Sequence, residues 1–492
     1  MAGFYITTSI PYVNAAPHIG HALEFAQADV IARYRKLVGY EVNLVTGADE
    51  NSLKNVKAAE AAGISVEELC SRNALLFREL ADRIGLSYTA FVRSSVSEAH
   101  RKGVGELWRR CAENGDIYKK RYKGLYCVGC EAFYTEGELV EGKCPEHKTK
   151  PDVVEEDNYF FRLSKYQESL ERMISKDQFR IMPESRKNEI LSFIRAGLED
   201  FSVSRSAGRA HGWGIPVPGD PSQTIYVWFD ALAVYITGVG FVGDEEHFMK
   251  TWPADVHVVG KGIIRFHSVY WPAMLLSAGI GIPKALFVHG YFTVNGEKMS
   301  KSIGNVVSPL NMMDKYGSDS LRYYFIRDSP NFEDSNFSEG ALVNRHNKEL
   351  LGDLGNLVNR VLTIAEKDGK SEFSGNAEMS KKLDMAEFRF RLDNGHLHEA
   401  LELAMAFVRE CNAYVNSKEP WKLKGPELDS VLYNLLESLR VISIIVYPFV
   451  PQSAEKIAGM LGSEIKSIED CKFRGSFSGR ITKGPHLFEK IG

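Results

Sequence analysis

The sequence predicts an α/β protein with a doubly wound, Rossmann-like parallel sheet. An insertion splits this sheet domain into two halves, and an all-α helical bundle follows it. Three observations predict this class. Residues 4–10 are rich in β-formers, a turn leads into an amphipathic helical pattern, and residues 42–46 form a second buried strand. Residues from 344 onward are helical in pattern. The strand pattern also returns in three later segments, at 224–229, 256–259 and 285–288. A strand–helix–strand unit favours a parallel sheet with ligand at the carboxyl ends of its strands.

The chain divides into five expected segments. With 492 residues, 44% of them hydrophobic, it is long enough for two to four domains of roughly 100–200 residues each. An aromatic, charged and hairpin-like composition sets the insertion apart from its neighbours. We expect the first half of a nucleotide-binding catalytic domain at residues 1–115, the insertion at 116–223 and the second half of that domain at 224–290. A linker at 291–343 and the helical domain at 344–492 follow.

Composition favours a soluble protein of the cytosol. Seven cysteines, an odd number in so long a chain, argue against a disulfide framework and for a reducing compartment. No signal peptide precedes Phe4, and no apolar run reaches the roughly 18 residues of a membrane span. The formal charge of -4 neither indicates nor excludes a nucleic-acid partner, because such a partner needs only a local basic track. We therefore expect a cytoplasmic protein without a membrane segment.

Two histidines lie at the start of the first helical pattern. His18 and His21 occupy its first turn with Gly20 between them. A helix amino terminus attracts anions through its free backbone N–H groups and its dipole, and glycine allows a ligand to approach the backbone. A single histidine in a turn is more often a capping or packing residue, but two on one turn favour a ligand site.

A second candidate for phosphate binding lies almost three hundred residues further on. Lys298 and Lys301 are each followed closely by a serine, on a segment flanked by Gly296 and Gly304. Two ammonium groups can share the charge that develops on a triphosphate, and the glycines allow the loop to close on a ligand. A solvated basic turn has the same composition, so the loop alone does not decide between the two interpretations.

Four potential metal ligands form two knuckles. A Cys-x-x-Cys pair is followed after thirteen residues by Cys-x-x-His, a spacing that closes a tetrahedron around zinc. The ligands would be Cys127, Cys130, Cys144 and His147. Because protein atoms fill all four positions, we expect one zinc ion with a structural role. The alternative is a redox Cys-x-x-Cys pair beside an incidental cysteine and histidine, although a redox pair needs no second knuckle.

The early His-Ile-Gly-His and the late Lys-Met-Ser-Lys-Ser together resemble the paired signature of the class I aminoacyl-tRNA synthetases, and within that class the methionyl-tRNA synthetases. Five further blocks are similar in order and spacing, at residues 126–130, 200–205, 213–218, 226–231 and 288–291. The resemblance implies a ligase that activates methionine with ATP and transfers it to the 3′ end of tRNA(Met) for protein synthesis, releasing AMP and diphosphate. It also implies Mg²⁺ that accompanies ATP.

The resemblance assigns roles to individual residues. It implies that His18, Gly20, His21 and Gly260 surround ATP, and that Lys298 and Lys301 hold its phosphates. The implied methionine site consists of Ile10, Tyr12, Asp49, Trp228, Ala231, Leu232, Tyr235 and His289. Polarizable, mostly apolar walls suit a thioether, although without the resemblance the aromatic residues would be taken as ordinary core. For the anticodon of tRNA it implies Asn356, Arg360 and Trp421, which a solvated helix surface would otherwise explain.

Two departures from the family and two alternatives remain. Asn51-Ser52 stands where the family usually has His-Gly, and Gly262 replaces an aspartate that usually helps to hold the ribose. Relatives that activate valine, isoleucine or leucine usually carry a larger insertion with an editing site, because one methylene changes substrate binding by only about 1–3 kcal/mol. The insertion here is too short for such a site, which favours methionine or cysteine as the substrate. A cysteine-specific or other small synthetase is one alternative. A catalytically silent RNA-binding relative is the other. Nothing after Gly492 could form an appended dimerisation domain, so we expect a monomer.

Overall fold

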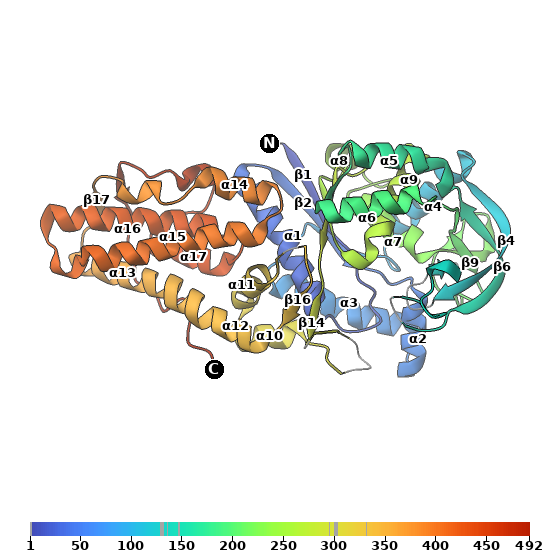
Figure 1. Ribbon diagram of the computed structural model, residues 1–492, viewed down its shortest axis with the longest axis horizontal. Coiled ribbons are helices and arrows are strands. Elements are labelled where there is room, and N and C mark those ends of the chain that lie inside the picture. Colours follow the sequence, from blue (N-terminus) through green and yellow to red (C-terminus); the bar gives the residue numbers. More distant parts are fainter. Residues whose placement is uncertain are drawn as a thin grey trace.

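The computed structural model describes residues 2–127, 132–134, 136–145, 148–294, 296–299, 304–330 and 332–492. Its elements form three groups along the long axis of the molecule (Figure 1). A parallel sheet with its helices lies in the middle, the antiparallel strands β4 and β6 lie toward one end, and the long helices α13, α15 and α16 lie toward the other. Among the described residues, no helix is both long and apolar enough to cross a membrane.

The central sheet has six strands in the order β3-β2-β1-β12-β13-β7, and every pairing in it is parallel. The order reverses between β1 and β12, which makes the crevice beyond their carboxyl ends the expected ligand site of a doubly wound sheet. The strands are β1 (Gly3–Thr8), β2 (Glu41–Ala48), β3 (Ala90–Arg93), β7 (Arg180–Met182), β12 (Val256–Gly260) and β13 (Ala285–His289).

Helices cover both faces of this sheet. Successive strand residues belong to two different hydrophobic clusters, as Ile6 and Tyr5 or Val258 and Val259 illustrate. One cluster contains the buried side of α1, and the other contains α4, α7 and α9. The helices of this region are α1 (Ile19–Val38), α2 (Leu53–Ala62), α3 (Val66–Arg83), α4 (Glu98–Glu113), α7 (Val227–Thr237), α8 (Glu245–Thr251) and α9 (Trp271–Ser277), with the 3₁₀ turn η3 (Lys261–Ile263) and the π-helical turn η4 (Phe266–Tyr270).

The insertion contributes two small antiparallel sheets. The first has the order β5-β4-β6-β8 and the second the order β10-β11-β9. Their strands are β4 (Ile117–Cys127), β5 (Ala132–Tyr134), β6 (Asp152–Phe161), β8 (Phe201–Ser202), β9 (Ser204–Ser206), β10 (Pro216–Val217) and β11 (Asp220–Ile225). The segment also contains η1 (Glu136–Glu138), η2 (Leu163–Tyr166), α5 (Gln167–Ser175) and α6 (Glu184–Arg195).

The prediction of a strand at residues 224–229 is wrong. Residues up to Ile225 end β11, which lies in the small antiparallel sheet, and residues from Val227 form α7. All residues from 227 to 236 are buried, so the run is apolar on every side. Periodicity cannot distinguish a fully buried strand from a fully buried helix. A second difference concerns β7, which lies within residues 116–223 but pairs with β13 at the edge of the central sheet.

The part of the chain after β13 is mostly helical, which confirms the helical pattern expected from residue 344. A small sheet, β15-β14-β16, comes first, with β14 (Phe292–Val294), β15 (Glu297–Lys298) and β16 (Ser335–Phe337). The helices are α10 (Pro309–Tyr316), α11 (Ser318–Asp328), α12 (Glu339–Arg345), the π-helical η5 (His346–Gly355), α13 (Asn356–Asp368), α14 (Met385–Asp393), α15 (Leu397–Lys418), α16 (Gly425–Val446) and α17 (Pro451–Met460). Shorter elements are η6 (Glu378–Lys381), η7 (Pro420–Lys422), η8 (Ile468–Cys471) and the paired strands β17 (Glu372–Ser374) and β18 (Ser476–Ser478).

A buried group of charges joins α1 to the helical end of the molecule. The Arg322 side chain is only 1% exposed; its Nη2 lies 2.8 Å from Asp29 Oδ2, and its guanidinium donates to the backbone oxygens of Ile84, Pro448 and Phe449. Arg33 binds the same carboxylate at 2.6 Å and donates to Tyr447 Oη at 2.8 Å. Each buried charge therefore has several partners, as a buried ion pair requires. This group, Asp29, Arg33 and Arg322, is called the junction below.

Candidate active site

The amino terminus of α1 is built around its two histidines. His18 is the N-cap, and its Nδ1 accepts a hydrogen bond from the Gly20 amide at 3.1 Å. His21 Nδ1 accepts from the His18 amide at 3.1 Å, which completes a capping box made from two imidazoles. The rings stack with their centroids 3.8 Å apart. A Cβ on Gly20 would lie 2.9 Å from His18 Cε1, so a larger residue here would displace the capping ring.

Burial keeps both rings uncharged, and the hydrogen bonds that their Nδ1 atoms accept fix their tautomers. It lowers the pKa of His18 to about 4, and burial together with the neighbouring His18 lowers the pKa of His21 well below its usual value. Because each Nδ1 accepts a hydrogen bond, the proton of each neutral ring must be on Nε2. The helix start therefore offers two imidazole N–H donors at the positive end of the helix dipole.

The described part of the lysine loop lies against this helix start. Met299 Cε is 3.7 Å from the position that a Cβ on Gly20 would occupy. The Ile19 amide also donates to the backbone oxygen of Val307, beyond the loop, at 3.1 Å. Lys298 lies in β15, and Gly296 and Gly304 both have positive φ angles, 78° and 73°. The expected phosphate ligand Lys301 lies outside the described residues. The structure thus brings the two signature segments together.

The glycine turn after β12 lies beside the end of β13. Gly260 lies beside His289, whose Cε1 would be 3.5 Å from a Cβ at that position. At Gly262 a Cβ would be only 2.0 Å from Tyr291 Oη, so the tyrosine occupies the space that a larger residue would need. Lys261 is bound to Asp334 at 2.6 Å, and the Asp334 carboxylate accepts from the Tyr291 amide at 3.0 Å. The departure at Gly262 is therefore matched by the neighbouring tyrosine.

The residues expected around methionine come from four segments that meet at the same crevice. Tyr12 and Asp49 form a parallel bridge between the segments that follow β1 and β2. Tyr12 contacts Trp228 edge-to-face with ring centroids 6.1 Å apart. Trp228, Ala231, Leu232 and Tyr235 occupy one face of α7, because they are three or four residues apart, and all four are buried. Ile10 lies at the end of β1, with its Cγ2 3.3 Å from the Cβ position of Gly47.

His289 is linked to the end of β1 through Glu24, which the sequence did not single out. Glu24 Oε1 accepts from the amide and the hydroxyl of Ser9 at 2.8 and 2.6 Å, and Glu24 Oε2 lies 2.9 Å from His289 Nε2. The other ring nitrogen of His289 lies 2.7 Å from the Gly290 carbonyl. Both side chains are buried. The carboxylate thus holds the ends of β1 and β13 at fixed positions on either side of β12.

Sequence reasoning missed the residues that η4 and α9 add to the crevice. Phe266 stacks on Trp228 with centroids 3.9 Å apart. His267 Nε2 lies 2.7 Å from Tyr235 Oη, and Trp271 meets Tyr235 edge-to-face. Burial lowers the pKa of His267 to about 4, so the ring is neutral; its Nδ1 donates to the Ile263 carbonyl at 2.9 Å, and its Nε2 accepts from the tyrosine. The aromatic composition of residues 266–271 was the available indication.

The unusual Asn51-Ser52 pair has a local explanation. Ser52 caps α2, accepting from the Lys54 amide at 3.0 Å. Asn51 Nδ2 donates at 2.6 Å to Asp230 Oδ2, and the other oxygen of that buried carboxylate lies 2.6 Å from His100 Nε2. Asp230 belongs to α7, the helix that carries Trp228 and Tyr235. Asn51 therefore ties the segment after Asp49 to the helix that lines the crevice.

At the helical end of the molecule the structure brings together two of the three residues expected to contact an anticodon. The Arg360 guanidinium carbon lies 5.7 Å from the ring centroid of Trp421, and its Nη2 donates to Asn416 at 2.9 Å. Trp421 is 54% exposed, an unusually large value for a tryptophan. Asn356 begins α13, one helical turn before Arg360, and is exposed as well.

Of the four expected zinc ligands, Cys130 and His147 lie outside the described residues. Cys127 and Cys144 are both buried. They meet at Thr149: Cys127 Sγ lies 4.0 Å from its hydroxyl, and the Cys144 amide donates to its carbonyl at 2.9 Å. The Lys148 amide donates to the Cys144 carbonyl at 2.9 Å. No group of three potential metal ligands occurs among the residues that the structure describes.

Comparison with known proteins gives a consistent result. The family model described as tRNA synthetases class I (M) matches residues 4–150 and 146–362. A methionine--tRNA ligase of Brucella suis is 42% identical over 474 residues, which are 93% of this chain and 91% of the relative. One of Caldanaerobacter subterraneus is 41% identical and covers 99% of this chain and 79% of its own.

Solved structures agree with the sequence relatives. Mycobacterium tuberculosis methionyl-tRNA synthetase in complex with methionyl-adenylate has a TM-score of 0.94 at 38% identity, over 99% of this chain and all of that one. The apo form of the same enzyme has a TM-score of 0.87 at 34% identity, over 100% of this chain and 99% of that one. The chain therefore belongs to the class I aminoacyl-tRNA synthetases, in their methionyl-tRNA synthetase branch.

Proposed function

We propose that this protein is a methionine--tRNA ligase, which forms methionyl-adenylate from methionine and ATP and then transfers the methionyl group to the 3′ end of tRNA(Met). The observation that carries the proposal is the neutral pair His18 and His21, which offers two Nε2–H donors at the start of α1, where Met299 of the Lys298 loop approaches Gly20. Uncharged N–H donors beside a helix amino terminus suit a polyphosphate that must bind and then leave.

In the activation step, the methionine carboxylate attacks the α-phosphate of ATP, and diphosphate leaves with the electrons of the broken phosphoanhydride bond. The chain needs no nucleophile of its own. His18 and His21 would donate to phosphate oxygens, and Lys298 and Lys301 would neutralise charge on the leaving group. Gly260 would allow the nucleotide to approach the backbone. Mg²⁺, bound mainly by phosphate and water, supplies further charge neutralisation when it accompanies ATP.

The crevice beside α7 suits methionine. Ile10, Tyr12, Trp228, Ala231, Leu232 and Tyr235 would surround the side chain, and Asp49 would hold the ammonium group. Aromatic rings make favourable contacts with a thioether sulfur. His267, which accepts from Tyr235, fixes the position of the phenol and adds a ring to the wall. His289 is held by Glu24 at the end of β13, next to the same crevice.

For the remaining roles we propose one structural zinc ion, held by Cys127, Cys130, Cys144 and His147. The meeting of Cys127 and Cys144 at Thr149 supports a common site for the two knuckles. Zinc would supply a cross-link between the two turns and no open position for substrate. Asn356, Arg360 and Trp421 would contact unstacked anticodon bases. We also propose that the enzyme works as a monomer in the cytoplasm, with the five segments expected from the sequence serving as its domains.

Amino-acid-dependent exchange of diphosphate into ATP, measured with each of the twenty amino acids, tests the proposed function. We expect exchange with methionine alone. Exchange with cysteine or another amino acid would assign the chain to a different specificity, and the absence of exchange with every amino acid would show a catalytically silent relative. Zinc content by atomic absorption, compared between wild type and Cys144→Ser, tests the metal separately, with about one equivalent expected only in the wild type.

A further inference from the structure

The proposed methionine site has two parts that come from different elements. The segment after β2 supplies Asp49 for the ammonium group, and α7 supplies Trp228 and Tyr235 for the side chain. One amino acid must reach both parts at once, so the spacing between them decides how well its length fits. A contact that fixes this spacing would contribute to methionine affinity without touching the substrate.

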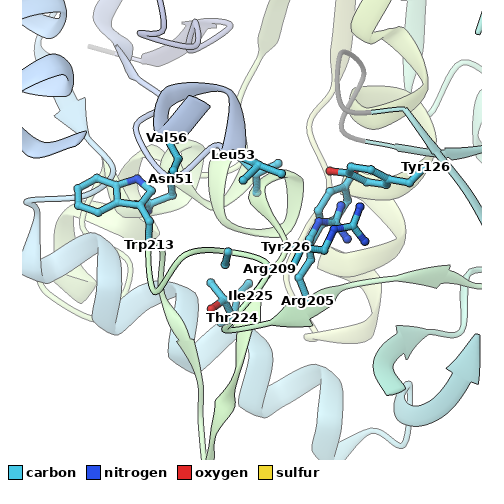
Figure 2. A pocket seen from close by; sticks show the side chains of 12 residues that line it. Asn51, Leu53, Val56, Tyr126, Arg205, Arg209, Trp213, Thr224, Ile225 and Tyr226 are labelled. Atoms are coloured by element: carbon cyan, nitrogen blue, oxygen red, sulfur yellow. The ribbon is translucent and has the colours of Figure 1, made fainter. Parts of the chain in front are cut away.

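Asn51 and Asp230 form a direct contact between the two parts. Asn51 Nδ2 donates to Asp230 Oδ2 at 2.6 Å. Asp230 lies in the first turn of α7 and is only 1% exposed, and a buried carboxylate depends on its hydrogen-bond donors. Figure 2 shows Asn51 beside Trp213 at one side of a small cleft, with Tyr226, the residue before α7, at the other side.

Helix α4 holds α7 from a second direction. His100 Nε2 lies 2.6 Å from Asp230 Oδ1, and His100 Nδ1 lies 2.8 Å from the hydroxyl of Thr237, the last residue of α7. Gly103 lets the two helices approach closely, because a Cβ there would lie 2.3 Å from Thr237 Cγ2. Helix α7 is therefore fixed on α4 at both of its ends, and Asn51 connects it to the segment after β2.

The backbone on the other side of this contact is held as well. Asn55 Nδ2 donates to the carbonyls of Asp49 and Glu50 at 3.0 and 2.8 Å. Trp213 Nε1 donates to the same Glu50 carbonyl at 2.7 Å. Because Asn51 is the next residue in the chain, its amide links a fixed backbone to a fixed helix.

We propose that Asn51 is a positioning residue for the amino-acid substrate, whose hydrogen bond to Asp230 sets the spacing between Asp49 and the aromatic wall of α7. This proposal rests on the proposed function and deepens it. The role does not involve ATP, whose proposed ligands lie at the start of α1 and in the turn after β12. Loss of the contact should therefore weaken methionine binding and leave ATP binding and the chemical step nearly unchanged.

The test replaces the amide of Asn51 by a carboxylate of the same size. In Asn51→Asp the two carboxylates repel each other unless they share a proton, so methionine-dependent diphosphate exchange is measured at about pH 8, which disfavours sharing. We expect KM for methionine to rise about 10-fold, the lower end of the loss of one hydrogen bond to a charged group. KM for ATP and kcat should change by less than about twofold.

A second variant makes the test independent of how well Asn51→Asp folds. Asn51→Ala removes the donor without adding a charge, and it should raise KM for methionine by about 3- to 10-fold, again without a matching change in KM for ATP. Circular dichroism of each variant reports folding.

Asn114→Asp is the matched control. Asn114 Nδ2 also donates to a buried carboxylate, Asp116 Oδ2, at 2.8 Å, but it does so at the opposite end of α4 from His100. The same chemical change there reports the effect of carboxylate repulsion on stability, and KM for methionine should remain that of the wild type.

The exchanged pair shows whether the contact itself matters. The double variant Asn51→Asp/Asp230→Asn again places one amide opposite one carboxylate, and it should bring KM for methionine back to within about threefold of the wild type. The single variant Asp230→Asn completes the double-mutant cycle.

Three outcomes would each overturn the proposal. They are a KM for methionine in Asn51→Asp or Asn51→Ala equal to that of Asn114→Asp, a loss that falls equally on methionine and ATP, and a double variant no better than Asn51→Asp. Absence of exchange in the wild type would instead reject the proposed function.

Discussion

The start and the middle of helix α1 use polar groups in opposite ways. At its amino terminus, His18 and His21 are uncharged, and each uses one ring nitrogen for capping and keeps the other as a donor. About two turns later, Asp29 and Arg33 are charged and have partners on α11 and near Tyr447. The difference teaches how to separate function from structure: a site retains hydrogen-bonding capacity for a ligand, whereas a structural joint satisfies its groups internally.

The largest effect should come from breaking the junction. We expect Arg322→Met to lower the free energy of unfolding by about 3–5 kcal/mol, because removal of one partner leaves a buried charge incompletely compensated. Urea unfolding followed by circular dichroism measures it. Arg121→Ala, which removes the exposed pair with Glu155, is the control and should change stability by about 0–1 kcal/mol. Similar losses in the two variants would contradict the structural role of the junction.

Lys301→Ala should produce the largest effect on chemistry. We expect methionyl-adenylate formation to fall about 10²–10³-fold, the usual result of removing one group that stabilises transition-state charge. Methionine binding, measured by tryptophan fluorescence, should change little, because the expected role of Lys301 is at the phosphates. Equal loss of binding and rate would reject the assignment of this loop to the transition state. Thermal stability should remain that of the wild type, in contrast to Arg322→Met.

A smaller effect is expected for Arg33→Lys, which keeps the charge beside Asp29. The lysine cannot also donate to Tyr447 and to the Gly85 carbonyl, as Arg33 does at 2.8 Å each. At about 0.5–1.5 kcal/mol for each lost hydrogen bond, the loss in unfolding free energy should be about 1–3 kcal/mol. Chemical denaturation of both variants under the same conditions ranks the stability losses of Arg33→Lys and Arg322→Met. A larger loss for Arg33→Lys than for Arg322→Met would show that hydrogen-bond geometry, and not charge, contributes most to the stability of the junction.

Acid should destabilise both the start and the middle of α1. Burial alone raises the pKa of Asp29, but the Arg322 and Arg33 charges outweigh it, and the net pKa is below its usual value. The unfolded chain therefore protonates first, and the stability from Asp29 is lost as pH falls through its folded pKa. His18, with a folded pKa of about 4 against 6.5, loses stability between these values for the same reason.

The titration of His18 is the smallest effect, and it is measured on the wild-type enzyme. We expect the His18 imidazole to remain neutral from pH 7 to pH 5 in the free enzyme. Its ring carbon chemical shift in NMR, assigned with His18→Gln, should stay constant over this range, while that of an exposed histidine titrates near 6.5. A His18 midpoint near 6.5 would show that the ring is solvated and would remove its distinction from an ordinary surface histidine.

The sequence predicted the helices and strands that are determined by their own local residue pattern. The stripe of α1 and its end at Gly39, which has a φ of 105°, follow from helical periodicity and from glycine in the left-handed region. Strands β1, β2, β12 and β13 are short, apolar and bounded by turns, and the sequence placed each of them. The proximity of Met299 to Gly20 also agrees with the expectation that the two signature segments form one site.

Long-range partners could not be predicted from the sequence. Residues 227–236 are buried on every side, so no pattern marked them as helix. Glu24 is a polar residue within an apolar helix, and its role appears only because β1 and β13 end beside it. His267 has the same explanation, since its partner Tyr235 lies on a different helix. Strand β7 joins the central sheet through a pairing with residues about a hundred positions away.

The strand order also determines when the enzyme can assemble during its synthesis. Ile6 of β1 pairs with Val256 of β12, 250 residues later. At roughly 5–20 residues per second, a ribosome needs about 12–50 seconds to add that length of chain. During this interval the sheet formed by β1, β2 and β3 has no partner strand beside β1. The insertion is synthesised before β12 becomes available. The nascent first half therefore presents an unpaired strand edge, which is where a chaperone would be expected to bind and where premature aggregation would begin.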